Sequence, residues 1–375
     1  MSANGRKVLV TGSEGFIGKN LISKLMLDEE IEILKADIDT DIKELDEMLL
    51  KSDFVVHLAG VNRPKDAEEF YSGNSGLTGY IAEKLLESKN RTPVLMTSSI
   101  HSDTDSDYGK SKRLAEEILF DYSKKSGAGV FVYKLPNVFG KWSRPNYNSA
   151  VATFCYNISR EIPIDIDDRE KTLNLVYIDD VIDSITDAVK GVPVKKEAGY
   201  SVVEKTYAAK LGEIENLLIS FETARKTNIF PKLEGIAKPL YSTYLSFLEP
   251  DNFSYEPSKI NSDSRGSFFE FFKTDGFGQF SVCTANPGEI RGNHWHHTKV
   301  EKFLVVEGEA VISFRKVFED EITSIEVKGE VPEIVDIPAG YTHNIKNTGD
   351  GRLTFVIWAN ELFSPEKPDT FYLEV

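Results

Sequence analysis

The stretch Val8-Leu9-Val10-Thr11-Gly12-Ser13-Glu14-Gly15-Phe16-Ile17-Gly18 decides the fold of the first half of the chain. A short apolar run leads into three glycines spaced G-x-x-G-x-x-G, and an amphipathic run follows to residue 27. Glycines at this spacing permit a tight turn, and they let the backbone approach a pyrophosphate at the positive end of a helix. A glycine trio alone is a weak signal, but its place between a strand and a helix favours dinucleotide binding over a turn needed only for packing.

Beyond this stretch, the first half alternates short apolar runs with amphipathic ones. We expect strands at residues 8–10, 54–58, 94–97 and 130–134, and helices at 16–27, 76–87, 111–122, 150–159 and 211–223. This rhythm predicts a Rossmann-type α/β fold, a doubly wound parallel sheet with helices on both faces.

After about residue 265 the helical period disappears. Short strands are expected at 279–284, 302–306, 310–315 and 353–358, separated by Gly, Asp and Pro turns. This pattern predicts an all-β sandwich or barrel. With the boundary in the proline-containing stretch near residue 250, the sequence predicts two domains, residues 1–249 and 250–375.

Composition limits the classes of partner and compartment. The chain has 375 residues, with 44 Lys+Arg against 60 Asp+Glu, a net charge of −16 and a pI of about 5.0. An acidic balance argues against nucleic-acid binding, and no apolar run is long enough to insert in a membrane. Only two cysteines, Cys155 and Cys283, are present, and the N-terminus does not read as a signal peptide. We therefore expect a cytoplasmic protein.

A Tyr-Lys pair follows the strand expected at residues 94–97. Tyr108 and Lys112 stand four residues apart on an expected helix and so share one face. The Lys112 ammonium is expected to lower the pKa of Tyr108, so that the phenol can exchange a proton with a substrate oxygen near neutral pH. Ser98 or Ser99 is expected to bond the same oxygen. The alternative is an exposed helix with solvated side chains.

Together these residues resemble the extended short-chain dehydrogenase/reductase family over residues 6–240. Further matching segments are His57-Leu58-Ala59-Gly60, Pro136-Asn137-Val138-Phe139-Gly140 and Tyr177-Ile178-Asp179-Asp180-Val181. The resemblance implies that Ser99, Tyr108 and Lys112 are catalytic and that Asn137 binds substrate. It also implies that the cofactor is bound by Gly12, Gly15, Phe16, Ile17, Gly18, Lys35, Leu58, Ala59, Tyr108 and Lys112.

The type of nicotinamide cofactor depends on the end of the second strand of this fold, which lies near residues 35–37. An acid there holds the ribose 2′-hydroxyl of NAD, whereas a basic residue suits the 2′-phosphate of NADP. The chain offers both Lys35 and Asp37.

A second site is indicated by the histidines, of which four of six fall after residue 290. His294, His296, Glu301 and His343 are residue types that suit a borderline divalent metal such as zinc. The alternative is that these histidines serve only packing and hydrogen bonding.

The spacing of this second site resembles the cupin family, G-x5-H-x-H-x4-E-x6-G followed by P-x-G-x2-H-x3-N. In the family the second pattern has a further glycine ahead of its proline, and Pro332 occupies that position here. The resemblance implies that His294, His296, Glu301 and His343 are the metal ligands of a jelly-roll domain. Segments around Arg265 and Arg291 also resemble cupin-fold sugar-nucleotide epimerases, in which the residue at His294 is a general base. We favour ligation by His294, and expect Arg265 and Arg291 to bind a diphosphate, with surface ion pairing as the alternative for Arg265.

Over residues 6–375 the chain resembles the bifunctional capsular-polysaccharide enzymes of the bacterial UDP-N-acetyl-L-fucosamine pathway. Segments that carry this resemblance are Ala59-Gly60-Val61-Asn62-Arg63-Pro64 and Gly292-Asn293-His294-Trp295-His296. It implies a homodimer that epimerises carbon 3 of a UDP-2-acetamido-2,6-dideoxy-4-keto-hexose and then reduces carbon 4 with NADPH. The alternatives are a single-activity reductase or dehydratase, whose second domain only binds sugar or dimerises, and a non-enzymatic sensor of the NADPH/NADP ratio.

Overall fold

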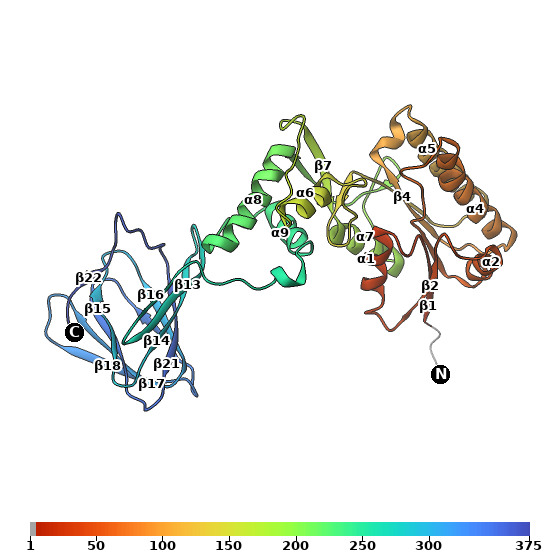
Figure 1. The fold of residues 1–375 in the computed structure, drawn as a ribbon. Helices are drawn as coiled ribbons and strands as arrows, with labels where there is room; N and C mark the ends of the chain where they lie inside the picture. Colours follow the sequence, from red (N-terminus) through yellow and green to blue (C-terminus); the bar gives the residue numbers. More distant parts are fainter. Residues whose placement is uncertain (1–4) are drawn as a thin grey trace. The chain divides into compact units, whose positions relative to one another are not determined.

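The structure, a computed structural model, describes residues 5–375, which divide into two compact units (Figure 1). The first unit comprises the described residues up to Glu215 together with Lys238–Leu248, and the second comprises Asn216–Ala237 and Glu249–Val375. The predicted division into residues 1–249 and 250–375 stays a proposal. The two compact units differ from it, because residues 216–237 group with the second unit.

A seven-stranded sheet forms the centre of the first unit. All neighbouring strands are parallel except the last pair. Parallel pairing of short β-branched strands needs crossover connections between them, and such connections are usually helical. The order is β2 (Ile31–Ala36), β1 (Arg6–Thr11), β3 (Phe54–His57), β4 (Val94–Ser99), β5 (Val130–Leu135), β9 (Tyr200–Ser201) and β8 (Lys196–Glu197).

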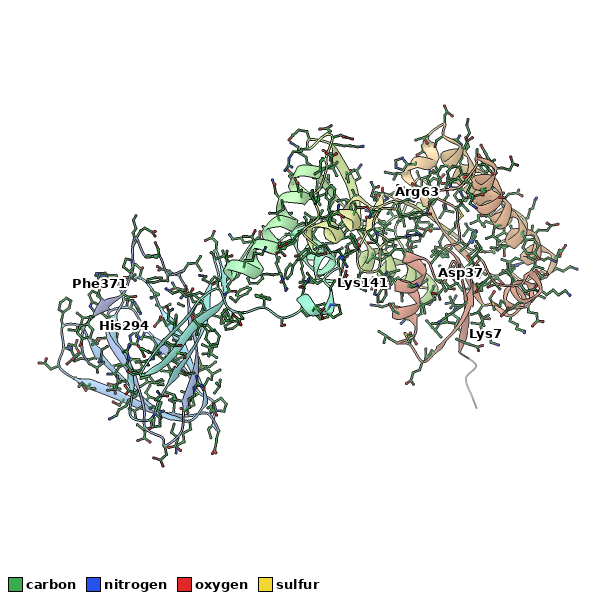
Figure 2. All side chains as sticks on the ribbon, viewed as in Figure 1. Lys7, Asp37, Arg63, Lys141, His294 and Phe371 are labelled. Atoms are coloured by element: carbon green, nitrogen blue, oxygen red, sulfur yellow. The ribbon has the colours of Figure 1, made fainter. Side chains whose placement is uncertain are left out.

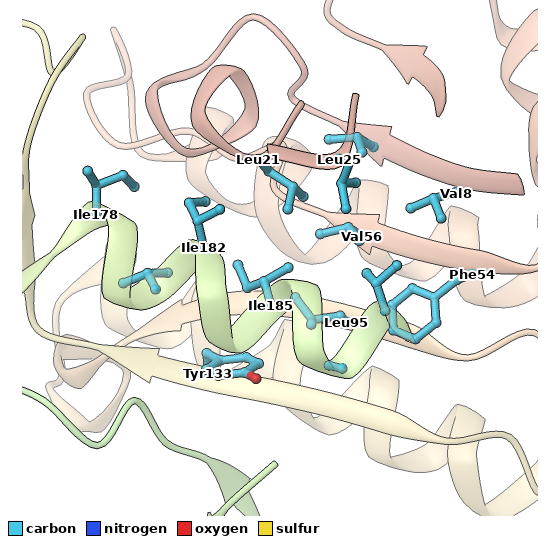
Figure 3. Packing of buried hydrophobic residues seen from close by; sticks show 14 of the residues in the cluster. Val8, Leu21, Leu25, Phe54, Val56, Leu95, Tyr133, Ile178, Ile182 and Ile185 are labelled. Carbon is cyan, nitrogen blue, oxygen red and sulfur yellow. The ribbon is translucent and has the colours of Figure 1, made fainter. Parts of the chain in front are cut away.

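Helices cover both faces of this sheet, each burying an apolar stripe. The core on one face joins α1 (Phe16–Leu25) and α7 (Ile178–Lys190) to the strands, and Figure 3 shows Leu21 and Ile185 within it. The core on the other face joins α2 (Ile42–Lys51), α4 (Leu77–Glu87) and α5 (Asp107–Ser126). A sheet that is apolar on both faces is thereby removed from water.

The remaining elements of the chain up to Asn252 are short or lie outside the main sheet. A three-stranded sheet has the order β10 (Tyr207–Lys210), β7 (Thr172–Tyr177) and β6 (Asn137–Phe139). The further helices are α3 (Glu68–Phe70), a π-helical turn (Tyr71–Gly76), 3-10 turns (Ile100–Asp103 and Pro250–Asn252), α6 (Ala150–Ile158), α8 (Leu211–Thr227) and α9 (Ala237–Leu245).

The second unit packs two largely antiparallel sheets around one core. Its cluster draws Phe303 and Phe355 from one sheet and Ile312 and Ile345 from the other. The first sheet has the order β11 (Ile229–Phe230), β13 (Gly266–Thr274), β14 (Gly278–Ala285), β21 (Leu353–Ala359), β16 (Glu301–Glu307) and β19 (Ile334–Ile337), with β12 (Ile260–Asp263) also on β13. The second has the order β18 (Ile322–Lys328), β17 (Glu309–Lys316), β20 (Tyr341–Asn347), β15 (Ile290–Trp295) and β22 (Phe371–Tyr372).

The expected elements are present in both halves, so the prediction of a Rossmann-type fold followed by a strand-rich domain is confirmed. The helices α2 and α7 were not among those expected. Both carry the helical apolar spacing, with Leu45 and Leu49 buried on α2 and Ile182 and Ile185 buried on α7, so the signal was present in the sequence.

Candidate functional site

The glycine turn joins β1 to α1 by close backbone packing. Gly12 has a φ of +68°, and a Cβ there would lie 2.6 Å from the backbone N of Ala59. A Cβ on Gly18 would lie 2.1 Å from the carbonyl O of Gly12. Because only glycine fits these positions, the N-terminus of α1 is held against the strand edge, where its N–H groups can donate to a pyrophosphate.

This turn opens onto a pocket of about 880 Å³. The predicted residues Lys35 and Ala59 do not line it, although Ala59 donates its N–H to Thr11 Oγ1 at 3.3 Å directly beside the glycine turn. The other predicted residues of the first unit do line it, namely Gly12, Gly15, Phe16, Ile17, Gly18, Leu58, Ser99, Tyr108, Lys112 and Asn137. The glycine turn that is expected to bind the dinucleotide and the Tyr108–Lys112 pair therefore line the same cavity.

Two adjacent serines of β4 take different roles in the pocket. The Ser98 hydroxyl donates to the buried carboxylate of Glu116 on α5. Ser99 is hydrogen-bonded to Tyr108 and accepts the N–H of His101 at 3.1 Å. The geometry thus favours Ser99 as the partner of Tyr108, a choice that the sequence left open.

Lys112 is buried beneath Tyr108, with only 8% of its surface exposed. Its ammonium donates to the Thr97 carbonyl at 3.4 Å, and burial lowers the pKa of Lys112 to about 8 against the attraction of Glu116. The expectation that Lys112 lowers the pKa of Tyr108 is wrong for this structure. Burial raises the pKa of Tyr108, and the hydrogen bond from Ser99 opposes that rise only in part.

The end of β2 offers one acidic and one basic side chain. The Asp37 carboxylate accepts the N–H of Glu14 at 2.7 Å and that of Ile38 at 2.9 Å, which ties it to the glycine turn. Lys35 is exposed on β2, where it pairs in register with Val10. Of these two side chains, Asp37 is therefore the one that contacts the glycine turn directly.

In the second unit, His294, His296, Glu301 and His343 converge as predicted. One ligand atom from each lies within 4.8 Å of all the others. The register places His294 of β15 directly opposite His343 of β20, and Glu301 begins β16. His296 Nε2 and His343 Nε2 are buried without a hydrogen-bond partner, and each lies 3.4 Å from Glu301 Oε2. Three imidazoles and one carboxylate with unpartnered nitrogens fit a divalent metal such as zinc.

The electrostatics of this cluster suit a cation. Burial acts to raise the pKa of Glu301, but the nearby His296 and His343 imidazoles, each 3.4 Å away, hold it well below its usual range. Burial together with His343 lowers the pKa of His294 to about 4. The group therefore presents an ionised carboxylate and, at His294, a neutral imidazole at neutral pH, the forms that ligate metals.

The C-terminal segment orients one ligand of this cluster. The Asp369 carbonyl accepts a hydrogen bond from His296 Nδ1, which leaves Nε2 for a metal. The Asp369 carboxylate accepts the N–H groups of His297, Thr298 and Lys299, each at 2.8 Å. Burial acts to raise the pKa of Asp369, but these N–H groups hold it well below its usual range. Sequence reasoning missed Asp369, because nothing local marks a residue more than 70 positions away as a partner of His296.

The predicted diphosphate ligands Arg265 and Arg291 both face Asp263. Arg265 Nη2 lies 2.7 Å from Asp263 Oδ2, and Arg291 Nη1 lies 3.4 Å from Asp263 Oδ1. Arg291 precedes His294 on β15, the strand that carries the label His294 in Figure 2. The structure thus brings the two arginines together at one shared carboxylate, which balances one of their two positive charges.

The glycine turn, the parallel sheet and the Ser99-Tyr108-Lys112 set define the first unit as a nucleotide-binding domain of the short-chain dehydrogenase/reductase type. Residues 8–197 match the NAD dependent epimerase/dehydratase family, and residues 261–371 match the polysaccharide biosynthesis C-terminal domain. The chain therefore belongs to the NAD dependent epimerase/dehydratase family, a family of nicotinamide-dependent proteins.

Two of the similar proteins match the chain over nearly its whole length. The chain is 45% identical over 371 residues to UDP-2-acetamido-2,6-beta-L-arabino-hexul-4-ose reductase of Pseudomonas aeruginosa, covering 98% of this chain and 99% of that protein. It matches the crystal structure of capsular polysaccharide assembling protein CapF from Staphylococcus aureus with a TM-score of 0.92 and 46% identity, covering 98% of this chain and 100% of that one. UDP-glucuronic acid 4-epimerase from Bacillus cereus, at 18% identity, a TM-score of 0.53 and coverage of 64% and 98%, shares the fold.

The contacts of Asp369 generate a prediction about metal affinity. Asp369→Asn removes the charge and one of the two oxygens that hold residues 297–299, so the segment that positions His296 loosens. We expect Zn²⁺ affinity of the full-length protein to fall about 10- to 100-fold, measured by competition with a chromophoric chelator. Glu366→Ala, in the same segment, is the control, because its exposed carboxylate contacts Ser364 and not the histidines. Equal affinity in wild type and Asp369→Asn would show that the segment does not position the ligand.

Proposed function

We propose that this chain is a bifunctional sugar-nucleotide enzyme for capsular polysaccharide synthesis. The second unit would epimerise carbon 3 of a UDP-2-acetamido-2,6-dideoxy-4-keto-hexose, and the first would reduce the carbon-4 ketone to the L-talose form. The observation that carries the proposal is the convergence of Ser99, Tyr108 and Lys112 in the dinucleotide pocket. The proposal is also supported by the 45% identity of the chain, over 98% of its length, to a protein named as a UDP-hexulose reductase.

The reductase step needs a proton for the ketone oxygen. When bound, the reduced nicotinamide supplies the hydride for the ketone carbon. Tyr108 donates its phenolic proton to the oxygen, while Ser99 hydrogen-bonds that oxygen and Lys112 supplies a positive charge in the same pocket. The ketone thereby gains one hydride and one proton and becomes an alcohol. A Tyr108 whose pKa is raised by burial is held protonated and ready to donate.

The epimerisation step needs a polarised ketone. When bound to His294, His296, Glu301 and His343, a divalent cation such as zinc supplies Lewis-acid stabilisation of the enolate. A base takes the carbon-3 proton, and a proton that has exchanged with solvent is delivered to the opposite face, so the step is neutral overall. Epimerisation must come first, because reduction of the ketone removes the acidity of the adjacent hydrogen. We assign His294 to ligation because its ring meets the other three ligands.

The finer parts of the proposal follow the resemblance of the chain. We propose NADPH as the reductant, a homodimer as the assembly, and the bacterial cytoplasm as the location. Asp37 beside the glycine turn makes the comparison of NADPH with NADH a direct check on the first of these. Among the described residues, no helix is long and apolar enough to cross a membrane.

The buried Lys112 generates a prediction about pH. Since the pKa of Lys112 is about 8, below its usual 10.5, the ammonium loses its proton as pH rises through 8. We expect kcat/KM for ketone reduction to fall about tenfold per pH unit above that point. Glu116→Gln removes the carboxylate that raises the pKa of Lys112, so the alkaline limb should move to lower pH.

Tyr200→Phe is the matched control for Glu116→Gln. It removes a hydrogen bond to the Glu116 carboxylate, 2.9 Å long, but keeps the charge, so the alkaline limb should stay near that of wild type. Helical circular dichroism verifies that both variants fold. A Glu116→Gln profile identical to wild type would mean that Lys112 does not set the limb.

Two variants separate the two activities of the full-length protein. Tyr108→Phe removes the proton donor and should lower NADPH oxidation by at least about 100-fold, while exchange of the carbon-3 hydrogen with deuterated solvent continues. His343→Ala removes a ligand and should lose both the exchange and the bound metal, measured by NMR and by elemental analysis.

Each variant also serves as the control for the other. Full exchange activity in His343→Ala would contradict the metal site, and normal NADPH oxidation in Tyr108→Phe would contradict the catalytic set. A wild type that reduces the ketone but shows no exchange would favour the alternative in which the second unit only binds sugar or dimerises.

A further inference from the structure

A second cavity of about 520 Å³ adjoins the dinucleotide pocket. It is lined by Arg63, Asn146 and the first turn of α6, and it shares Tyr147, Asn148 and Ser149 with the dinucleotide pocket. Arg63, labelled in Figure 2, lies in the loop between β3 and α3, whereas Tyr147 precedes α6. Segments more than 80 residues apart therefore line one cavity within the first unit.

Two arginines gather on one aromatic ring in this space. The Cζ of Arg63 lies 5.5 Å from the Tyr147 ring centroid, and that of Arg144 lies 5.2 Å from it. Arg63 Nε also donates to Asn148 Oδ1 at 2.8 Å, which fixes the guanidinium. Arg144 lines the dinucleotide pocket and Arg63 lines the adjoining cavity. Stacking on a tyrosine orients a guanidinium while leaving most of its N–H donors available.

The charge of these arginines is unbalanced within residues 5–375. No Asp or Glu of this described part forms an ion pair with Arg63 or Arg144, although the chain carries 60 acidic residues against 44 basic ones. By contrast, Arg265 and Arg291 share Asp263. Two guanidinium groups near one ring repel each other, and an anion between or beside them would remove that repulsion.

The surrounding backbone adds to the positive field and is held in place. No acidic residue stands in the first turn of α6, whose positive end forms part of the wall. Asn146 has a φ of +54°, rare for a residue with a side chain, and its N–H donates to Thr153 Oγ1 at 3.0 Å. This contact ties the loop that carries Tyr147 to α6.

We propose that Arg63, Arg144 and Tyr147 form the subsite for the diphosphate of the sugar nucleotide. This inference rests on the proposed function, because it names where that substrate is held. Bidentate N–H donors match the geometry of phosphate oxygens. We assign the site to substrate and not to the cofactor, because the glycine turn at Gly12, Gly15 and Gly18 already offers a cradle for the cofactor pyrophosphate. Since the two cavities share the wall formed by Tyr147, Asn148 and Ser149, a substrate whose diphosphate lies at this wall has its sugar beside the pocket that contains Tyr108.

The test measures binding of UDP, uridine and NADPH to the full-length protein by calorimetry. Arg63→Ala and Arg144→Ala should each raise the Kd for UDP roughly tenfold or more, with little change for uridine, which lacks the diphosphate, or for NADPH. Lys65→Ala is the matched control, since Lys65 is an exposed cation two residues from Arg63 that lines neither cavity. It should bind UDP as wild type does.

Two results would overturn the assignment. One is UDP binding in both arginine variants that equals wild type, and the other is a loss of NADPH binding in place of UDP binding, which would give the site to the cofactor. Turnover of the 4-keto sugar nucleotide separates this inference from the proposed function. Normal wild-type turnover with unaffected arginine variants rejects the subsite alone, whereas arginine-dependent UDP binding without turnover supports the subsite and rejects the function.

Discussion

The close backbone packing at the site of the first unit depends on glycine, which has no Cβ, at positions 12 and 18. A Cβ on Gly18 would fall 2.1 Å from the Gly12 carbonyl oxygen, and one on Gly12 would fall 2.6 Å from the Ala59 nitrogen. This approach sets the start of α1 at the edge of the parallel sheet, where β1, β3 and β4 also end. The pocket, with Ser99, Tyr108 and Lys112 in its wall, lies at that edge because of it.

Burial then decides the chemistry of each side chain at the site. Lys112 and Glu116 are both buried, one turn apart on α5, and the carboxylate limits how far the pKa of Lys112 falls. In the second unit, burial and the imidazoles act on Glu301 in opposite directions, and the imidazoles prevail. Each unit thus buries an acid beside basic partners, and burial of an acid in a core is costly unless it has such partners.

Features encoded by local spacing could be predicted from the sequence, whereas pairings through space could not. The glycine turn, the Tyr108–Lys112 spacing and the His294-x-His296 motif each lie within a few residues, and each is found where it was expected. The choice of Ser99 over Ser98 depends on Glu116, which lies 18 residues beyond Ser98. Asp369 and the Arg63–Tyr147 contact join segments more than 70 residues apart, and the pairing of Arg265 with Asp263 shows that a guanidinium near a motif can already be neutralised.

The central claim is that two sites act in turn on one ketone. Its most direct test supplies wild-type protein with the unepimerised 4-keto sugar nucleotide and NADPH in deuterated water, and locates deuterium in the reduced product by NMR. The account predicts a product with deuterium at carbon 3 and protium at carbon 4. A product formed at the normal rate with protium retained at carbon 3 would contradict it.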